Sequence, residues 1–441
     1  MLLLIVFLHG NAFSQEKSIL QSGPMLGYCE MKEAVIWLQT TQNATVRIEY
    51  FDVDNPNNVF ISENFTTSEE VGFTYHIILK QISPGTKYNY QVFIDNKQII
   101  FPFETSFSSK KLWQWREDAP DFSVALGSCS YISEKELDRP GKPYGSGYKI
   151  FESINAKNPN IMIWGGDNIY LREADWDSKT GIYHRYTHSR SLKELQPLLA
   201  KTQNFAIWDD HDFGPNDSDR SFYFKNLTQK AFKDFWGNKI YGTDLDQTSG
   251  IYSTFNWGDA QFFLLDNRFF KSPNTRKTGE KTMLGSQQLE WLIDALSSSN
   301  AGFKIIVIGG QVLNSEAIFE NYETYPDEKN KLLKEISDNK IKGVMFISGD
   351  RHFAELSVLK RPNDYSLYDW TVSPLTSGVV SEDKVLQEKN SNREENSNFS
   401  VNNFGTLSFS GDKNNRQIKL ALFDANGIEL WQKVIFKKDL Q

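Results

Sequence analysis

The chain has 441 residues, of which 39% are hydrophobic and 14% aromatic, so it is long enough to bury a large core and to form two or three domains. Its formal net charge is -8, and no block of lysine and arginine residues occurs along it. These features argue against nucleic acid as a partner, because binding to phosphate backbones depends on a basic surface. A phosphorylated substrate is not excluded, since bound cations would reverse the local field.

Residues 1–14 resemble a secretory signal peptide. An apolar run over 2–8 is followed by small residues, and 12–14 have the small-x-small pattern of a cleavage site. The basic segment that normally comes first is missing, and a buried first strand is the alternative. No other run approaches the length of a membrane span. We therefore expect a periplasmic or secreted protein without a membrane-spanning segment after signal removal, and we expect it to be a monomer.

Residues 22–105 predict an all-β domain. Runs of β-branched and aromatic residues at 34–38, 45–50 and 75–79 are separated by turns rich in Asn, Pro, Gly and Asp. The segment 82–92 begins with a Pro-Gly-Thr turn and continues as an alternating strand, as in fibronectin type III and immunoglobulin-like sandwiches. We expect such a β-sandwich, with a binding or bracing role. A Ser/Lys-rich and then Trp-rich stretch over 106–120 is the expected linker.

Residues 121–437 predict an α/β layered sandwich, because apolar strands alternate with helices. The expected strands are 122–126, 161–164, 205–208, 262–265, 305–308 and 344–347. The clearest helix has leucine and isoleucine at 289, 292, 293 and 296, and others centre on 192–199, 224–236 and 332–336. The segment 418–431 predicts a β-hairpin. Residues 381–403 predict a long mobile loop.

Polar residues follow almost every strand of this second domain. The densest stretch, 209–217, combines several carboxylates with one imidazole and one carboxamide directly after a buried apolar strand. Loops at the carboxyl ends of strands converge on one crevice in layered α/β folds, so Cys129, Asp167 and Asp210 are expected to meet. Carboxylates at this density are costly unless they are solvated or neutralised by cations. We interpret the stretch as a metal site; the alternative is an exposed acidic turn.

These strand-end motifs resemble those of the calcineurin-like metallophosphoesterases, and most closely those of the PhoD-type alkaline phosphatases. The motifs are Gly-Ser-Cys at 127–129, Gly-Asp-Asn-x-Tyr at 166–170, Trp-Asp-Asp-His-Asp at 208–212 and Gly-Asp-x-His at 349–352. They occur in the family's order, and the preceding β-sandwich is also found in that family. The sequence departs from the family in two respects: it has no twin-arginine export signal, and the region between Asp167 and Asp210 is short.

The resemblance implies a metal cluster described for the family as iron with calcium. The donor types are compatible with this, since a thiolate and a phenolate suit iron, and carboxylates and carboxamides suit calcium. The expected metal ligands are Cys129, Asp167, Tyr170, Asp210, Asn216, Asp350 and His352. Asp167 is the expected bridging carboxylate. Taken singly, Cys129, Tyr170 and His352 have an alternative role as packed core residues.

Two further side chains are expected beside the substrate. His211 is placed next to a bound phosphate, where it would donate to the leaving group or stabilise the transition state; a hydrogen bond to a carboxylate is the alternative. Arg172 would clamp phosphate oxygens, or form a surface ion pair. Asp266 and Arg268 are expected to orient the ligands. Gln311 is a further possible ligand. Of the two cysteines, Cys29 has the option of a disulfide with Cys129, which we expect to be a metal donor instead.

The resemblance thus implies an exported alkaline phosphatase acting on a small phosphoester. A phosphodiesterase or phospholipase-D-like enzyme on the same scaffold is the nearest alternative. A catalytically inactive binding protein and an iron oxidoreductase are alternatives of other classes. No nucleophile elbow, zinc-protease motif or P-loop occurs in the sequence.

Overall fold

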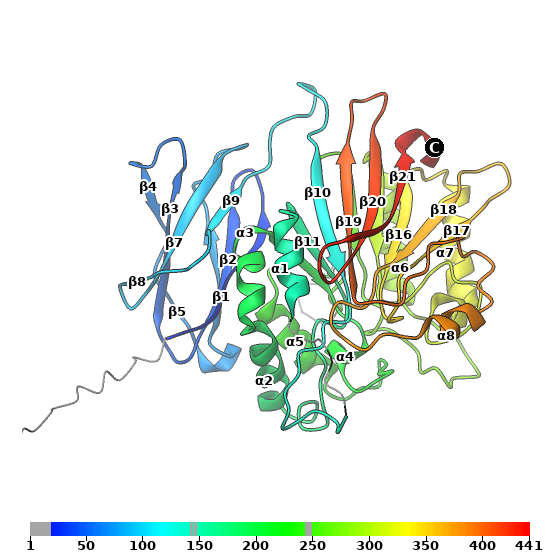
Figure 1. The fold of residues 1–441 in the computed structure, drawn as a ribbon, viewed down its shortest axis with the longest axis horizontal. Coiled ribbons are helices and arrows are strands. Elements are labelled where there is room, and N and C mark those ends of the chain that lie inside the picture. The colour runs from blue at the N-terminus through cyan, green and yellow to red at the C-terminus, as the bar shows by residue number, and fades with distance from the viewer. Residues whose placement is uncertain (1–18, 142–143, 145–147, 243–248) are drawn as a thin grey trace, which may run out of the picture.

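The computed structural model describes residues 19–141, 144, 148–242 and 249–441 of the chain. The expected signal peptide at 1–14 lies outside the described residues. An all-β N-terminal part packs beside a larger part built on two six-stranded sheets (Figure 1). Within the part of the chain that the structure describes, none of the helices combines the length and the apolar character needed to span a bilayer.

The N-terminal part consists of two antiparallel sheets. The first has the order β1-β2-β6, with β1 (Leu20–Cys29), β2 (Ala34–Thr40) and β6 (Thr74–Leu79). The second has the order β4-β3-β7-β8, with β5 paired to β3 and β9 to β7; its strands are β3 (Thr45–Asp52), β4 (Val59–Ile61), β5 (Phe65–Thr66), β7 (Lys87–Ile94), β8 (Lys97–Ile99) and β9 (Ser106–Ser108). Alternate residues of β3 and β7 are buried, as expected when one face of a sheet covers a core. The expected linker at 106–120 therefore begins with a strand, and the connection starts after Ser108.

The first large sheet is mixed and has the order β12-β11-β10-β19-β20-β21. Strands β10, β11 and β12 are parallel, whereas β19, β20 and β21 are antiparallel to their neighbours. The strands are β10 (Phe122–Gly127), β11 (Ile161–Gly165), β12 (Gln203–Ile207), β19 (Asn403–Ser410), β20 (Gln417–Asp424) and β21 (Glu429–Phe436). The last two form the hairpin that the sequence predicts.

The second large sheet is also mixed, with the order β13-β14-β15-β16-β18-β17. Its four inner strands are parallel and the two edge strands are antiparallel to them. The strands are β13 (Ser253–Trp257), β14 (Ala260–Leu264), β15 (Phe303–Val307), β16 (Val344–Ser348), β17 (Glu355–Leu359) and β18 (Leu367–Thr371). The inner strands β15 and β16 are buried on both faces, which explains their continuous apolar sequences.

Eight α-helices and four short 3-10 helices connect the described strands. The α-helices are α1 (Lys149–Ala156), α2 (Lys179–Arg190), α3 (Gln196–Lys201), α4 (Asp210–Phe213), α5 (Lys225–Phe235), α6 (Gly285–Ser298), α7 (Pro326–Asp338) and α8 (Glu382–Gln387). The 3-10 helices are η1 (Glu69–Val71), η2 (Lys193–Leu195), η3 (Tyr322–Thr324) and η4 (Lys437–Leu440). Helix α3 packs on β1, and α6 packs on α7.

The segment 381–403, expected as a long mobile loop, is ordered by local contacts. It contains α8, and Val385 in that helix is fully buried. Arg393 forms an ion pair with the buried carboxylate of Glu355 in β17. A buried charge held in this way ties the segment to the sheet, so part of the expected long loop is helical and part is anchored to β17.

The two large sheets face each other across an aromatic core. Phe205 in β12 stacks on Phe255 in β13, with ring centroids 3.8 Å apart. Phe409 in β19 contacts the rings of Phe262 and Phe303, which belong to the second sheet. The stacking brings the carboxyl ends of the parallel strands of both sheets to the same edge of the molecule.

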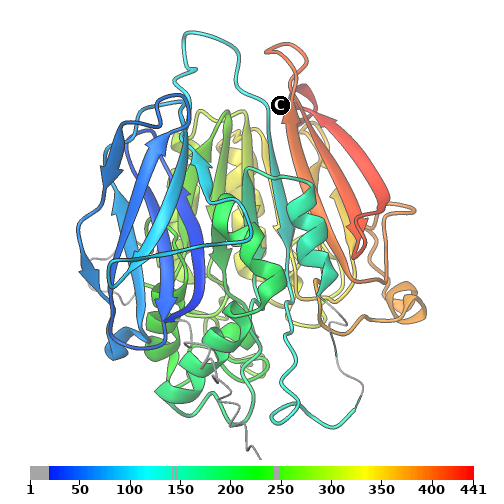
Figure 2. The same cartoon turned by 60° about the vertical axis from the view of Figure 1, so that its left-hand side comes forward.

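The N-terminal sheets contact the larger part directly, as Figure 2 shows from a second side. Trp37 in β2 is fully buried and donates through Nε1 to the carbonyl of Asp234 at 2.8 Å. Tyr90 in β7 donates to the carbonyl of Ala200 at 2.6 Å. These buried contacts between segments far apart in sequence fix the position of the N-terminal part.

Candidate metal centre

The candidate site lies at the carboxyl ends of strands from both large sheets. Cys129 follows β10, and Asp167 and Tyr170 follow β11. Asp210 and His211 open α4, directly after β12. Asp350 and His352 follow β16 in the other sheet. The parallel orientation of these strands is the reason that the side chains meet.

Four overlapping groups of donor atoms occur here, and within each group the atoms lie within 4.8 Å of one another. The groups are Cys129, Asp167 and His352; Asp167, Asp210 and His211; Asp167, Asp209, Asp210 and Asp350; and Asp210, Asp217 and Glu320. Asp167 belongs to three of them. Its central place is what a carboxylate shared between two cations requires.

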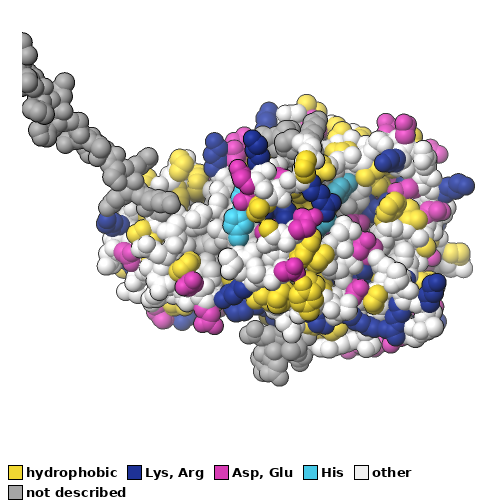
Figure 3. Space-filling view, turned by 90° about the horizontal axis from the view of Figure 1, so that it is seen from below, with side chains coloured by type: hydrophobic (Ala, Val, Ile, Leu, Met, Phe, Trp, Pro, Cys, Tyr) yellow, Lys and Arg dark blue, Asp and Glu magenta, His cyan; other side chains and the backbone are white. Residues whose placement is uncertain are grey.

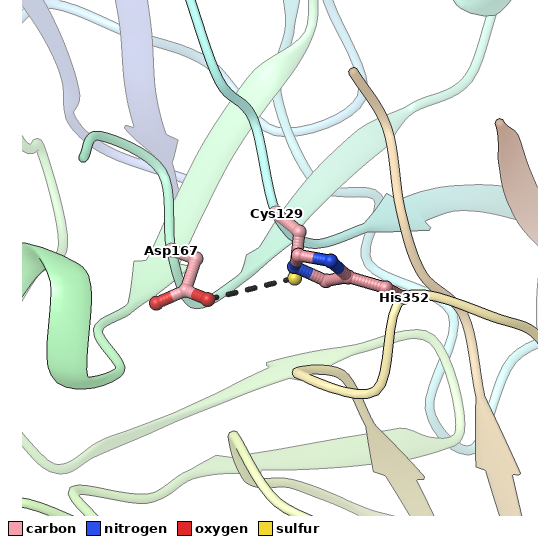
Figure 4. A group of neighbouring side chains, drawn as sticks. All are labelled: Cys129, Asp167 and His352. Carbon is pink, nitrogen blue, oxygen red and sulfur yellow. Dashed lines mark hydrogen bonds between the residues drawn. The ribbon is translucent and has the colours of Figure 1, made fainter. Parts of the chain in front are cut away.

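Cys129, Asp167 and His352 come from three different loops and point toward one another (Figure 4). The sulfur of Cys129 lies 3.5 Å from Asp167 Oδ2 and accepts from the hydroxyl of Ser373 at 3.2 Å. The Tyr170 hydroxyl lies 3.4 Å from Asp167 Oδ2 and 3.2 Å from His352 Nε2. The thiol, phenol, carboxylate and imidazole thus form one contiguous set of donors. Both cysteines are free, so no disulfide joins Cys29 to Cys129.

Four of these donors have an unusual backbone conformation. Cys129, Asp167, Asp350 and His352 have φ values of 60°, 52°, 67° and 57°. Non-glycine residues seldom adopt the left-handed region, and each such residue carries a conformational cost of about 1–3 kcal/mol. Strained residues cluster at functional sites, and here they supply members of two donor groups that share Asp167.

The site concentrates negative charge out of water. Burial, with Asp210 and Asp209 adding, raises the pKa of Asp167 well above its usual value. Burial, with Asp167 adding, also raises the pKa of the Cys129 thiol. Burial lowers the pKa of His352 to about 4, which keeps its imidazole neutral and able to donate a lone pair. Such an environment favours a bound cation, which would offset the repulsion between the carboxylates.

Unpartnered oxygens support the same conclusion. Asp209 Oδ2, Asp210 Oδ1, Asn168 Oδ1 and Asn267 Oδ1 are buried and have no hydrogen-bond partner among the described residues. Leaving buried acceptors unpaired is costly in a folded protein. Carboxylate and carboxamide oxygens are the donors preferred by calcium, whereas the thiol and phenol suit a transition metal. The residues present therefore fit a mixed metal centre.

The structure adds residues that sequence reasoning did not assign to the site. Asp209 and Asp217 lie in the acidic stretch, where the motif reading singled out only Asp210 among the acids as a ligand. Asn267 lies two residues after the expected strand ending at 265, and its Oδ1 is buried without a hydrogen-bond partner among the described residues. Glu320 lies in the long connection between β15 and α7, and no motif marks it.

The expected substrate residues take different positions. His211 is half-buried, its ring lies 4.2 Å from that of Tyr170, and its backbone N–H donates to Asp167 Oδ1 at 3.3 Å. Asn216 is exposed at the rim of the cleft. Arg172 is buried and donates to Asp138 at 2.7 Å and to the carbonyl of Ile132 at 2.8 Å. The Arg172 ion pair is thus internal rather than on the surface.

Arg268 is the buried cation that orients the acidic loop. Its Nε donates to Asp209 at 2.5 Å and its Nη1 to Glu320 at 2.7 Å. Asp266 does not contact the Arg268 guanidinium; its carboxylate accepts from backbone N–H groups and from Trp208 Nε1 at 2.7 Å. Gln311 is engaged elsewhere, since its amide contacts Glu355, Thr371, Asn314 and Arg351. The interpretation of Gln311 as a ligand is therefore not supported by its position.

A cleft of about 720 Å³ opens beside the donors. Tyr170, His211, Asn216, His352 and Ser377 form part of its wall. Figure 3 shows this end of the molecule, where histidine side chains reach the surface among acidic, basic and apolar ones. A substrate entering the cleft would reach the donors.

Comparison with known proteins gives a family for most of the chain. Residues 124–420 match the family described as PhoD-like phosphatase, and residues 17–112 match a domain of unknown function (DUF7800). Alkaline phosphatase D of Bacillus subtilis (strain 168) is 21% identical over 284 residues. That alignment covers 53% of this chain and 46% of the relative, so the chain spans about half the length of the curated relative it matches.

Two solved structures share the fold. A structure of PhoD superposes with a TM-score of 0.74 at 15% identity, covering 93% of this chain and 88% of that one. Purple acid phosphatase PPD1 from yellow lupin (Lupinus luteus) seeds superposes with a TM-score of 0.65 at 13% identity, covering 95% of this chain and 75% of that one. At these identities the likeness establishes the architecture of the sheets alone.

Proposed function

Since the chain belongs to the PhoD-like phosphatase family, we propose that it is a metal-dependent phosphoester hydrolase of the alkaline phosphatase type. The observation that carries the proposal is the set of donors at the strand ends, with Asp167 shared by three of the four groups. The proposal extends to export into the periplasm or the medium. We also propose that the N-terminal sheets form an immunoglobulin-like sandwich and that residues 121–437 form the catalytic domain.

The proposed metal centre uses donors of two kinds. Cys129, Tyr170 and His352 would hold iron, and Asp210 with Asn216 would hold calcium, with Asp167 as the shared carboxylate and Asp350 as a further ligand. When bound, the cations supply Lewis acidity, which neutralises phosphate charge and lowers the pKa of a water molecule.

The chain's own residues position the substrate and move the proton. His211 lines the cleft beside Asp167 and Asp210, where its imidazole would donate a proton to the leaving-group oxygen of a bound ester. Arg268 holds Asp209 and Glu320 in place from behind. Arg172 supports the loop after β11, because its guanidinium binds the carbonyls of Tyr170 and Ile132. Among the described residues Nη1 donates only to the carbonyl of Tyr170, so a contact of its second N–H with phosphate is part of the proposal.

Hydrolysis of p-nitrophenyl phosphate at alkaline pH tests this function, with iron and calcium supplied. We expect Asp167→Asn to lower kcat at least about 100-fold and to reduce the metal content measured by elemental analysis, because even residues behind metal ligands cost 10–100-fold. A chelator should abolish the activity of the native chain and added metal should restore it. Cys129→Ser should remove a visible thiolate-to-iron absorption band.

Asp294→Asn is the matched control, since Asp294 is exposed on α6 and far from the donors in sequence. It should change neither activity nor metal content. Full activity in Asp167→Asn would refute the site assignment. Redox turnover sensitive to reductants would instead favour the oxidoreductase.

A phosphodiesterase is the second candidate, and the volume of the cleft favours it. About 720 Å³ is far more than one phosphate group occupies, so a second ester group has room. Bis(p-nitrophenyl) phosphate distinguishes the two: a diesterase hydrolyses it at least as efficiently as the monoester.

A further inference from the structure

The cleft beside the donors is much larger than the reacting group of a phosphoester. Pockets of about 300–1,000 Å³ enclose drug-sized molecules, and this one measures about 720 Å³. The phosphate would occupy only its inner end, next to Tyr170, His211 and His352. The remaining space must therefore receive the organic part of the ester.

A row of aromatic rings leads from the opening of the cleft to the donors. The Tyr131 ring lies 5.0 Å from that of Tyr144 and 5.0 Å from that of Tyr170. The Tyr131 hydroxyl donates to Asp138 at 2.7 Å, and the Arg172 guanidinium lies 4.2 Å from the centre of its ring. Tyr131 is thus fixed and covered by neighbours, so it is not free to stack on a ligand.

Among the described residues of the wall, Tyr144 and Trp176 are two aromatic side chains available to face a ligand. Tyr144 is 49% exposed although it lines the cleft, and its ring is close to the Gly378 Cα, where an added Cβ would lie 2.8 Å away. Trp176 is partly buried against the hydrophobic core and lines the same cleft. Exposed aromatic faces in a concave site favour planar rings, by stacked or edge-to-face contact.

The charged residues of the described wall come in pairs. Arg172 lies 2.7 Å from the carboxylate of Asp138, and Arg139 lies 3.2 Å from that of Glu173. Paired charges leave this part of the cleft with little net field. An uncharged organic group therefore fits it better than a charged one.

We propose that the substrate of this site is a phosphoester whose organic part carries an uncharged aromatic ring, bound between Tyr144 and Trp176. The inference rests on the proposed function, because it names the substrate class of the same site. Tyr144 and Trp176 determine specificity and take no part in the proton transfer.

Two phosphate esters of primary alcohols, one with an aromatic ring and one without, measure the effect of the substrate's ring. With 2-phenylethyl phosphate and ethyl phosphate the bond that breaks is of the same kind, so intrinsic reactivity is matched. We expect the native enzyme to show a kcat/KM for 2-phenylethyl phosphate at least about tenfold higher. Trp176→Ala and Tyr144→Ala should each lower that value roughly 5- to 30-fold and leave ethyl phosphate within about twofold.

Two controls separate stacking from general damage. Trp176→Phe keeps an aromatic face and should retain the preference within about threefold. Trp115→Ala should leave kcat/KM unchanged for both substrates, since Trp115 is 97% exposed and does not line the cleft. An equal loss for both substrates in Trp176→Ala would overturn the proposal, as would no loss for either.

A binding measurement keeps the proposal testable apart from catalysis. Calorimetric titration with 2-phenylethylphosphonate and ethylphosphonate, whose P–C bonds resist hydrolysis, should show tighter binding of the former, and Trp176→Ala should remove the difference. Should the metal-loaded enzyme hydrolyse no phosphoester, the proposed function fails. Should it hydrolyse both esters without preference and bind both phosphonates equally, the aromatic subsite alone fails.

Discussion

The position of the Asp209 carboxylate depends on hydrogen bonds to one of its oxygens and on a glycine that leaves room for the other. Its Oδ1 accepts from Arg268 and from Asn267 at 2.8 Å, whereas its Oδ2 has no partner among the described residues. Gly309, at the end of β15, supplies the space: a Cβ there would lie 2.5 Å from Asp209 Oδ2 and 2.6 Å from Asn267 Nδ2. The absence of a side chain at Gly309 thus allows the Asp209 carboxylate to take its position.

We expect Gly309→Ala to displace Asp209 and so to weaken the metal centre. Metal content and kcat should fall at least about tenfold, the magnitude usual for residues that support ligands. Elemental analysis and hydrolysis of p-nitrophenyl phosphate measure both, and the thermal unfolding curve shows whether the fold is retained.

The neighbouring Gly310→Ala is the control. A Cβ at Gly310 would have its nearest contact with the carbonyl oxygen of Glu320, at 3.3 Å, which a small shift relieves. It should therefore retain most of the metal and activity. If Gly309→Ala retained as much metal and activity as Gly310→Ala, the position of Asp209 would not matter for the metal centre.

Most of the donors could be predicted from the residue types and their order along the chain. Cys129, Asp167 and Asp350 each follow an apolar strand directly, so the rule that parallel strands end at one edge applies to them. Glu320 escaped this reasoning because it lies far from any strand end, in a connection whose path depends on tertiary packing. The same limit applied to Arg172, because its partner Asp138 lies 34 residues away in another loop.

Most strands with a continuous apolar run were predictable from the sequence. Strands that are defined mainly by backbone hydrogen bonds to a neighbouring strand were harder to predict. The six expected strands of the second part correspond to β10, β11, β12, β14, β15 and β16. By contrast, β9 was placed in a linker because three residues, Ser-Phe-Ser, carry almost no periodic signal. The edge strands β13 and β17, whose pattern is mixed, were not predicted either, and nor were β18 and β19, which lie inside their sheets.

Strand β6 carries a pH-sensitive contact with α5. Nε2 of His76 lies 2.9 Å from the carbonyl oxygen of Trp236, the residue after α5, and an N–H at Nε2 donates to it in the neutral ring as well as in the protonated one. Burial lowers the pKa of His76, although the Trp236 carbonyl and Asp234 act in the opposite direction. The His76 imidazole thus binds a proton less readily in the folded chain than in the unfolded chain. Its contribution to the free energy of unfolding is therefore fully present above pH about 6.5 and is lost as the pH falls below that value.

We expect the free energy of unfolding of the native chain to fall, relative to that of His76→Gln, between about pH 7.5 and about pH 5. Glutamine keeps an N–H donor but does not titrate, so other titrating groups cancel in the comparison. Urea denaturation at several pH values measures the difference. A constant difference across this range would contradict a lowered pKa of His76.

Strands β1 and β2 share a hydrophobic core with the larger part, whereas the buried residues between the two N-terminal sheets form a second cluster of their own. Met25, Tyr28, Val35 and Trp37 from β1 and β2 belong to the same buried cluster as the residues of the two large sheets. Domains joined by a large apolar interface lose the independent motion that is otherwise expected of them. The N-terminal part therefore stabilises the larger part through this contact, in addition to any binding role that it has.

Trp37 is the residue through which this coupling is best tested. Its side chain is fully buried, its ring lies 5.8 Å from that of Phe235, and its Nε1 binds the carbonyl of Asp234. We expect Trp37→Ala to lower the free energy of unfolding by about 3–5 kcal/mol, as usual for a buried aromatic residue. Trp115→Ala, at a 97% exposed tryptophan, should change it by less than about 0.5 kcal/mol.

The same experiment shows whether the two parts unfold together. Far-ultraviolet circular dichroism and hydrolytic activity, followed through a urea titration, should fall in one coincident transition in the native chain, because removing either part exposes the shared core. In Trp37→Ala both probes should shift to lower urea by the same amount. If activity survived while the β-sheet signal of the N-terminal part was lost, the two parts would be independent, and Trp37 would stabilise only the sheet that contains it.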